Sequence, residues 1–129
     1  MAKLAELGVT VERKFLADED VTEIAFTLPK PTSAQATFRS ESFGERLLKV
    51  FKKELQTGDG IFDEAVLIKT DTEEVTSELL KSVELRAVIE RVVTSGGAVE
   101  LDGAFVKLEM PGRNDIEESL LVHLVQALS

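Results

Sequence analysis

The dipeptide Asp102-Gly103 limits the fold of this chain more than any other feature of its sequence. It separates two short runs in which apolar and polar residues alternate. The apolar positions of these runs are Val99, Leu101, Val106 and Leu108. Alternation with a period of two is typical of a strand with one buried face, and Asp-Gly between two such runs is a strong signal for a tight turn. The sequence therefore predicts a β-hairpin here, closed by Pro111-Gly112.

The same alternation occurs in the first forty residues. Its apolar positions are Val9, Val11, Phe15, Ile24, Phe26, Leu28, Ala36 and Phe38. We expect two or three antiparallel strands in this region, interrupted at residues 28–33, where two prolines favour an extended turn. Residues 1–7 fit a short helix or a strand equally well. Residues 62–68 are typical of one further strand, which follows a turn at Asp59-Gly60.

Three other segments have the periodicity of amphipathic helices. They are residues 43–56, 72–95 and 114–128. Ser82 is placed to cap a new helix, so the second segment fits either one helix or two with a kink between them. Together these elements predict an α+β fold. We expect a mostly antiparallel sheet of five to six strands with about three helices packed on it, in a single domain that spans residues 1–129.

Composition narrows the class of protein. The chain has 129 residues, no cysteine and a net charge of −9. Without cysteine there are no disulfides and no thiolate metal ligands. No apolar run approaches the ~20 residues of a membrane helix, so we expect a cytoplasmic protein without direct membrane insertion. Residues 61–129 hold fourteen acidic and six basic side chains, a balance of −8 that argues against nucleic acid as a partner.

The last predicted helix has an unusually broad apolar side. It includes Leu120, Leu121, Leu124, Val125 and Leu128. So wide a stripe indicates burial on more than one side. Either the helix inserts into its own core, or these residues form the interface of a homodimer. His123, the only histidine, falls at the margin of the stripe, and we expect it to have a structural role.

A basic patch is the best candidate surface for a protein partner. Arg46, Lys49, Lys52 and Lys53 share one side of the first predicted helix on an otherwise acidic chain. Such a patch would attract an acidic segment. Cations near the C-terminus of a helix also suit its dipole, which would explain Lys52 and Lys53 without any partner.

Acidic residues gather at the predicted turn before residue 65. Asp59, Asp63 and Glu64 could supply oxygen ligands to Mg²⁺ or Ca²⁺, but their spacing matches no calcium loop. Alternatively, the carboxylates accept hydrogen bonds that fold the turn, with Phe62 anchored in the core. No phosphate-binding glycine loop and no nucleophile motif is present in the sequence. We therefore expect no catalytic residues and no cofactor.

The sequence of this turn and of the segments after it resembles that of other proteins. The segment from Gly58 to Asp63 has the pattern GD-x-x-FD, and Thr70-Asp71, Leu85-Arg86 and Asp102-Gly103 follow it. In this order the segments resemble a family of uncharacterised bacterial proteins, many of them membrane-associated. The resemblance covers residues 55–110. It implies that this region forms one structural unit, and it implies no activity.

These observations favour a non-enzymatic binding or protein-interaction module, whose partner is another protein or a second copy of the chain. One alternative is a small acidic adaptor similar to the secretion chaperones, which share its size, acidity and α+β character. The other is a small metal-dependent enzyme that uses Asp59, Asp63 and Glu64.

Overall fold

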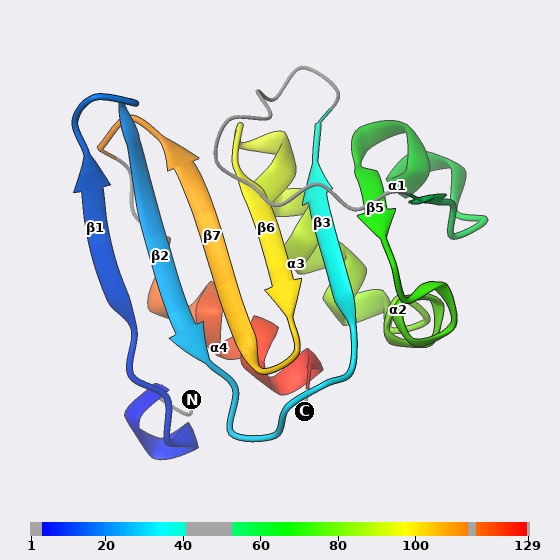
Figure 1. The fold of residues 1–129 in the computed structure, drawn as a ribbon, viewed down its shortest axis with the longest axis horizontal. Coiled ribbons are helices and arrows are strands. Elements are labelled where there is room, and N and C mark those ends of the chain that lie inside the picture. The colour runs from blue at the N-terminus through cyan, green and yellow to red at the C-terminus, as the bar shows by residue number, and fades with distance from the viewer. Residues whose placement is uncertain (1–3, 41–52, 114–115, 129) are drawn as a thin grey trace.

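The computed structural model describes residues 4–40, 53–113 and 116–128. These residues build one antiparallel sheet in the order β1-β2-β7-β6-β3-β5-β4 (Figure 1). Six of the strands have four or more residues, and β4 has three. The strands are β1 (Glu12–Leu16), β2 (Val21–Thr27), β3 (Gln35–Arg39), β4 (Lys53–Leu55), β5 (Leu67–Thr70), β6 (Ala98–Asp102) and β7 (Phe105–Pro111). The predicted α+β class with a mostly antiparallel sheet is confirmed.

Helices cover one face of this sheet. They are the short 3-10 helix η1 (Leu4–Leu7), α1 (Gly60–Ala65), α2 (Glu73–Leu79), α3 (Val83–Thr94) and α4 (Glu118–Ala127). Figure 1 shows α3 and α4 behind the central strands, while α1 and α2 lie at the end of the sheet that carries β5. In the described part of the chain, no helix lies on the other face of β1, β2, β7 and β6. No described helix is long and apolar enough to cross a membrane.

The predicted hairpin is present, one residue later than the sequence indicates. Asp102 pairs with Phe105, so the two-residue turn is Gly103-Ala104 and not Asp102-Gly103. Gly103 has φ of 64° and Ala104 has no positive φ. This combination fits the type II′ turn, which places glycine at its first central position because other residues adopt positive φ at a cost.

The first forty residues contain three strands, but only two of them are neighbours. β1 and β2 form a hairpin, whereas β3 pairs with β6 on one side and β5 on the other. The proline segment carries the chain past the β6–β7 turn. There the amide of Leu28 donates to the Ala104 carbonyl oxygen at 2.7 Å, and Thr32 Oγ1 donates to the Gly103 carbonyl oxygen at 2.9 Å.

Two helices occupy the segment 72–95, as one of the two interpretations predicted. The break lies at Ser82, whose Oγ accepts from the amide of Leu85 at 3.1 Å and so caps α3. The last helix begins later than residue 114, because α4 starts at Glu118.

Two further predicted elements differ from the structure. The expected strand over residues 62–68 is wrong in its first part: residues 60–65 form α1, and β5 begins at Leu67. Asp59 starts α1 because its Oδ1 accepts from the amide of Phe62 at 3.3 Å. The expected helix over residues 43–56 lies mostly outside the described residues, and it does not extend to 56, because residues 53–55 form β4 and pair with β5.

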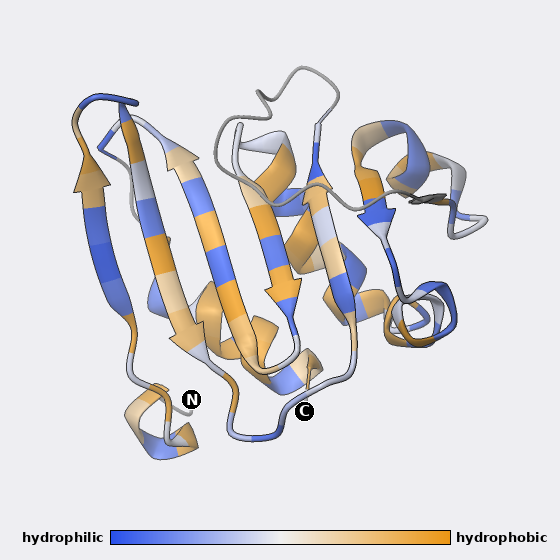
Figure 2. Cartoon of the chain, in the orientation of Figure 1, coloured by the Kyte–Doolittle hydropathy of each residue, from blue (hydrophilic) through white to orange (hydrophobic). Residues whose placement is uncertain are grey.

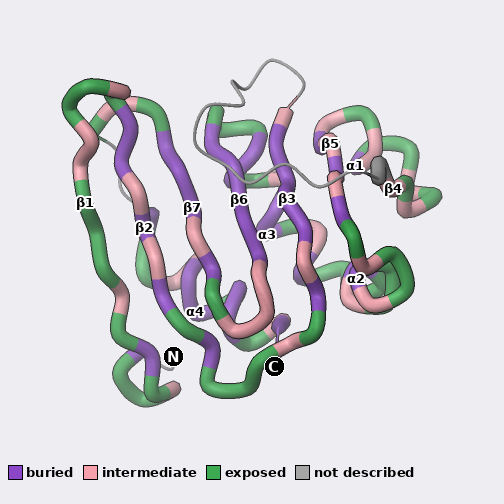
Figure 3. The backbone as a smooth tube through the Cα atoms, viewed as in Figure 1, coloured by how far each residue is buried: buried purple, intermediate pink, exposed green. Residues whose placement is uncertain are grey.

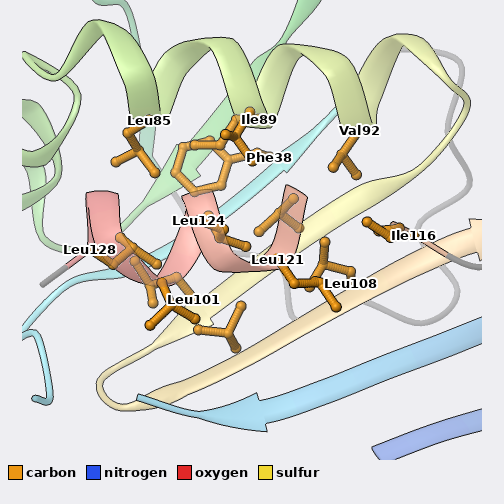
Figure 4. Close-up of a cluster of buried hydrophobic side chains, with 14 of the residues drawn as sticks. Phe38, Leu85, Ile89, Val92, Leu101, Leu108, Ile116, Leu121, Leu124 and Leu128 are labelled. Carbon is orange, nitrogen blue, oxygen red and sulfur yellow. The ribbon is translucent and has the colours of Figure 1, made fainter. Parts of the chain in front are cut away.

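The hydrophobic core lies between the sheet and α3 and α4. Figure 4 shows α3 and α4 packed on each other and on the strands, with Leu121 and Leu124 in the same cluster as Phe38, Ile89 and Leu108. Figure 2 shows why one face of the sheet supplies this core: apolar and polar residues alternate along β2, β6 and β7. Figure 3 shows that the central strands β6 and β3 are largely buried, whereas the edge strand β1 is largely exposed. Burial of a large apolar side chain contributes roughly 1.5–3 kcal/mol, so this layer is the main source of stability.

Candidate functional site

The acidic turn is a closed hydrogen-bonded structure. Asp63 Oδ1 accepts from the amide of Thr57 at 2.9 Å and from its Oγ1 at 2.8 Å, and Asp63 Oδ2 accepts from the amide of Gly58 at 3.0 Å. Burial would raise the pKa of Asp63, but the hydrogen bonds from Thr57 and Gly58 and the charge of Arg86 outweigh it, and the pKa is lowered. Asp63 therefore stabilises the turn in its charged, deprotonated form.

The other carboxylates of the turn do not complete a metal site. Asp59 caps α1 and places Oδ2 3.4 Å from Nε of Arg86, whose Nη1 donates to the Leu80 carbonyl oxygen at 2.6 Å. Phe62 is buried and Glu64 is exposed. Among the described residues, no three carboxylate or histidine side chains lie close enough together to hold a metal ion. The geometry thus supports the structural interpretation of Asp59, Phe62 and Asp63, and it argues against a metal site.

The predicted basic patch lies almost wholly outside the described residues. Arg46, Lys49 and Lys52 belong to the segment 41–52, which the structure does not describe, and Lys53 is the first residue of strand β4. Lys53 therefore does not lie on the C-terminal turn of a helix, and the dipole argument does not apply to it.

Most of the residues expected at a dimer interface on the last helix lie in the core of the chain itself. Leu121, Leu124, Val125 and Leu128 are buried within the chain itself, and Leu120 packs against the same core. Buried side chains are not accessible to a second copy, whereas Leu120 is only partly buried, so the homodimer itself stays a prediction. The alternative, insertion of this helix into its own core, is confirmed. His123 is exposed.

The helix-free face of the sheet brings together side chains that the sequence analysis did not single out. Cross-strand partners lie on the same face, so the register places them in rows. One row contains Lys14, Glu23, Glu109 and Ala98; the next contains Glu12, Ala25, Lys107, Glu100 and Thr37; the third contains Thr27, Phe105, Asp102 and Gln35. We call this surface the helix-free face.

Three of these side chains form a charged strip: Glu100, Lys107 and Glu109. Lys107 Nζ lies 3.5 Å from Oε2 of Glu100 and 3.7 Å from Oε1 of Glu109. Glu109 is 0% exposed, and neither of its carboxylate oxygens has a hydrogen-bond partner. Burial raises the pKa of Glu109 to about 7; the nearby Lys107 lowers it, and Glu23 and Glu100 add to the rise. Glu109 therefore changes its charge near neutral pH.

Beside the charged strip lies a hollow of about 370 Å³. We call it the β2 hollow, and it is lined by Gly8, Thr10, Glu12, Ala25, Phe26, Thr27 and Phe105. Ala25 is the cross-strand partner of Glu12 on one side and of Lys107 on the other, and Thr27 is the partner of Phe105. The side chains of Ala25 and Thr27 are small, so they leave space between these larger neighbours. The ring side chain of Phe105 is 44% exposed. Glu109 does not line the hollow.

A sequence signal for these residues exists, but it is incomplete. The alternation that predicts the last hairpin also predicts that Phe105, Lys107 and Glu109 share one face. It does not show that β2 separates β7 from β1, and without this order Glu12 and Phe105 cannot be placed around the same hollow.

Comparison with protein families, with curated proteins and with solved structures finds no match to this chain. The resemblance of residues 55–110 to the GD-x-x-FD proteins stays a prediction.

Proposed function

We propose that this chain is a non-enzymatic protein-interaction module that works in the cytoplasm and binds a protein partner through its helix-free face. The observation that carries the proposal is Phe105 at the edge of the β2 hollow. Of the described residues, Ile61, Val83 and Phe105 are large, apolar and exposed. Phe105 is the one of the three that lines the β2 hollow.

Aromatic side chains next to a depression are typical anchors of protein interfaces, because a ring buries a large area and loses little conformational entropy. The net charge of −9 favours a protein partner over a nucleic acid, because a negatively charged chain repels the phosphate backbone. The engaged carboxylates of the acidic turn favour binding over metal-dependent catalysis. An acidic adaptor similar to the secretion chaperones falls within the same proposal, because it too requires a protein partner.

The test is a comparative capture experiment from cells that express the protein. Wild-type chain, Phe105→Asp and the control Ile61→Asp are immobilised, and the retained proteins are quantified by mass spectrometry. Ile61 is 77% exposed on α1, at the opposite end of the sheet from β1 and β2, so Ile61→Asp introduces the same charge away from the hollow. We expect one set of proteins that the wild type and Ile61→Asp retain and Phe105→Asp loses.

The proposal fails if the three forms retain the same proteins, or if Ile61→Asp loses the partner and Phe105→Asp keeps it. Melting curves of the three forms must agree within a few degrees, which separates loss of binding from loss of fold.

A further inference from the structure

The walls of the β2 hollow differ in chemistry. One wall is the partly exposed ring of Phe105 on β7, and the opposite wall is the carboxylate of Glu12 on the edge strand β1. The floor between them is Ala25 and Thr27 of β2. Glu12 is exposed, and its carboxylate makes no ion pair or hydrogen bond with any residue that the structure describes.

This combination selects for a cation with an apolar stem. A negatively charged ligand would meet Glu12 and the field of a chain with net charge −9. A purely apolar ligand would cover an exposed carboxylate and gain nothing from it. A side chain that ends in a positive group satisfies Glu12, while its methylene groups and its charge lie against the Phe105 ring.

Arginine fits better than lysine. Its guanidinium is flat, stacks on aromatic rings and binds a carboxylate through two parallel N–H groups, whereas an ammonium group is compact and strongly hydrated. The chain itself contains this pairing elsewhere: the Arg113 guanidinium lies over the Phe15 ring at 3.8 Å from its centre. Phe15 is on β1, and its Cα pairs with Thr22 of β2.

Positive groups near the hollow do not cancel this preference. Lys107 is the cross-strand partner of Ala25, but its ammonium lies between Glu100 and Glu109, at 3.5 Å and 3.7 Å. Lys14 is on β1 in the next row, where Glu23 is its cross-strand neighbour, and it does not line the hollow. Asp102 adds a further carboxylate as the cross-strand partner of Phe105.

We infer that the β2 hollow receives an arginine side chain from a segment of the partner protein, stacked on Phe105 and paired with Glu12. The inference rests on the proposed function and names the chemistry of the partner at this face. A hollow of about 370 Å³ accommodates one long side chain, so the arginine anchors a contact that the surrounding face extends.

The test is a chemical-shift titration of the ¹⁵N-labelled chain with the peptide Ac-Gly-Arg-Gly-NH₂. The matched probe contains citrulline in place of arginine, which keeps the shape and removes the charge. We expect arginine to shift the amides of Thr10, Ala25, Thr27 and Phe105, and citrulline to bind more weakly. High salt should weaken the arginine effect, because it screens the exposed carboxylate.

Two variants assign the contact. Glu12→Gln should weaken arginine binding roughly two- to fivefold, the range for an exposed ion pair, and should abolish the preference over citrulline. Phe105→Leu keeps an apolar wall without a ring and should also weaken binding. The control Glu64→Gln removes an exposed charge from α1, at the other end of the sheet, and should leave binding unchanged.

Equal binding of arginine and citrulline, or equal binding by Glu12→Gln and the wild type, overturns the inference. So does a set of shifted amides away from the hollow. If Phe105→Asp still loses the captured partner in those cases, the helix-free face binds protein and only the arginine assignment fails. If the capture experiment also shows no dependence on Phe105, the proposed function fails as well.

Discussion

Glu109 makes the stability of this protein depend on pH in a direction that can be worked out from the structure. Its carboxylate is fully buried, has no hydrogen-bond partner and has a pKa raised from 4.5 to about 7. A group whose pKa is raised in the folded state favours folding at low pH and loses this contribution as pH rises through the folded pKa. Below pH 4.5 the group is protonated in both states, and above pH 7 the folded state must hold a buried charge.

The magnitude follows from the difference between the two pKa values. A shift from 4.5 to about 7 corresponds to roughly 3 kcal/mol over the whole window, and most of it falls between pH 5 and pH 8. Other carboxylates oppose this trend, so the wild-type curve alone is not diagnostic. The comparison is with Glu109→Gln, which keeps the shape and removes the titration.

Glu109→Gln carries its own cost, because a buried amide without partners is destabilising. That cost does not depend on pH, and it cancels when the same variant is compared at two pH values. We therefore expect the stability of Glu109→Gln relative to wild type to be more favourable at pH 8 than at pH 5, by roughly 2–3 kcal/mol.

The assay is urea denaturation at pH 5 and pH 8, followed by far-ultraviolet circular dichroism because the chain has no Trp and no Tyr. Glu64→Gln is the control: because Glu64 is exposed, this substitution should change the free energy of unfolding by the same amount at pH 5 and at pH 8. Parallel stability curves for the wild type and Glu109→Gln between pH 5 and pH 8 would refute the reasoning, because they would mean that Glu109 does not titrate differently in the folded state.

Three further predictions concern the fold. Asp63→Ala leaves the amides of Thr57 and Gly58 without their acceptor, so we expect it to lower the free energy of unfolding by about 1–3 kcal/mol, measured by thermal or urea unfolding. Because the pKa of Asp63 is lowered in the folded state, this difference from wild type should shrink only when the pH falls below the usual Asp value of 3.8. Gly97→Ala would place a Cβ 2.5 Å from Met110 Sδ and 2.8 Å from a backbone carbonyl oxygen, so we expect a loss of about 1–3 kcal/mol, and an unchanged melting temperature would contradict the close packing at this point. Leu121→Ala opens a cavity in the core and should cost about 2–5 kcal/mol independently of protein concentration; a cost that varies with concentration would return this residue to a dimer interface.

Local patterns predicted most elements because their causes are local. The last hairpin follows from alternation and a glycine that adopts positive φ, and the break at Ser82 follows from a side chain that caps α3. The strand expected over residues 62–68 failed because capping by Asp59 favours a helical turn before the alternation begins. The helix expected over residues 43–56 stops short of 56 because Leu55 pairs with Ile68, a contact that helical periodicity does not reveal.

The sequence by itself determined the type of most elements, the α+β class and the face of each strand that turns to the core. These properties depend on φ preferences, capping and a period of two or 3.6, which neighbouring residues set among themselves. Only the tertiary structure decided that β2 lies between β1 and β7, that Glu109 is buried beside Lys107, and that Glu12 and Phe105 line one hollow. The physical reason is that strand order results from covering all apolar faces with α3 and α4 at once, a condition on the whole chain that no short segment contains.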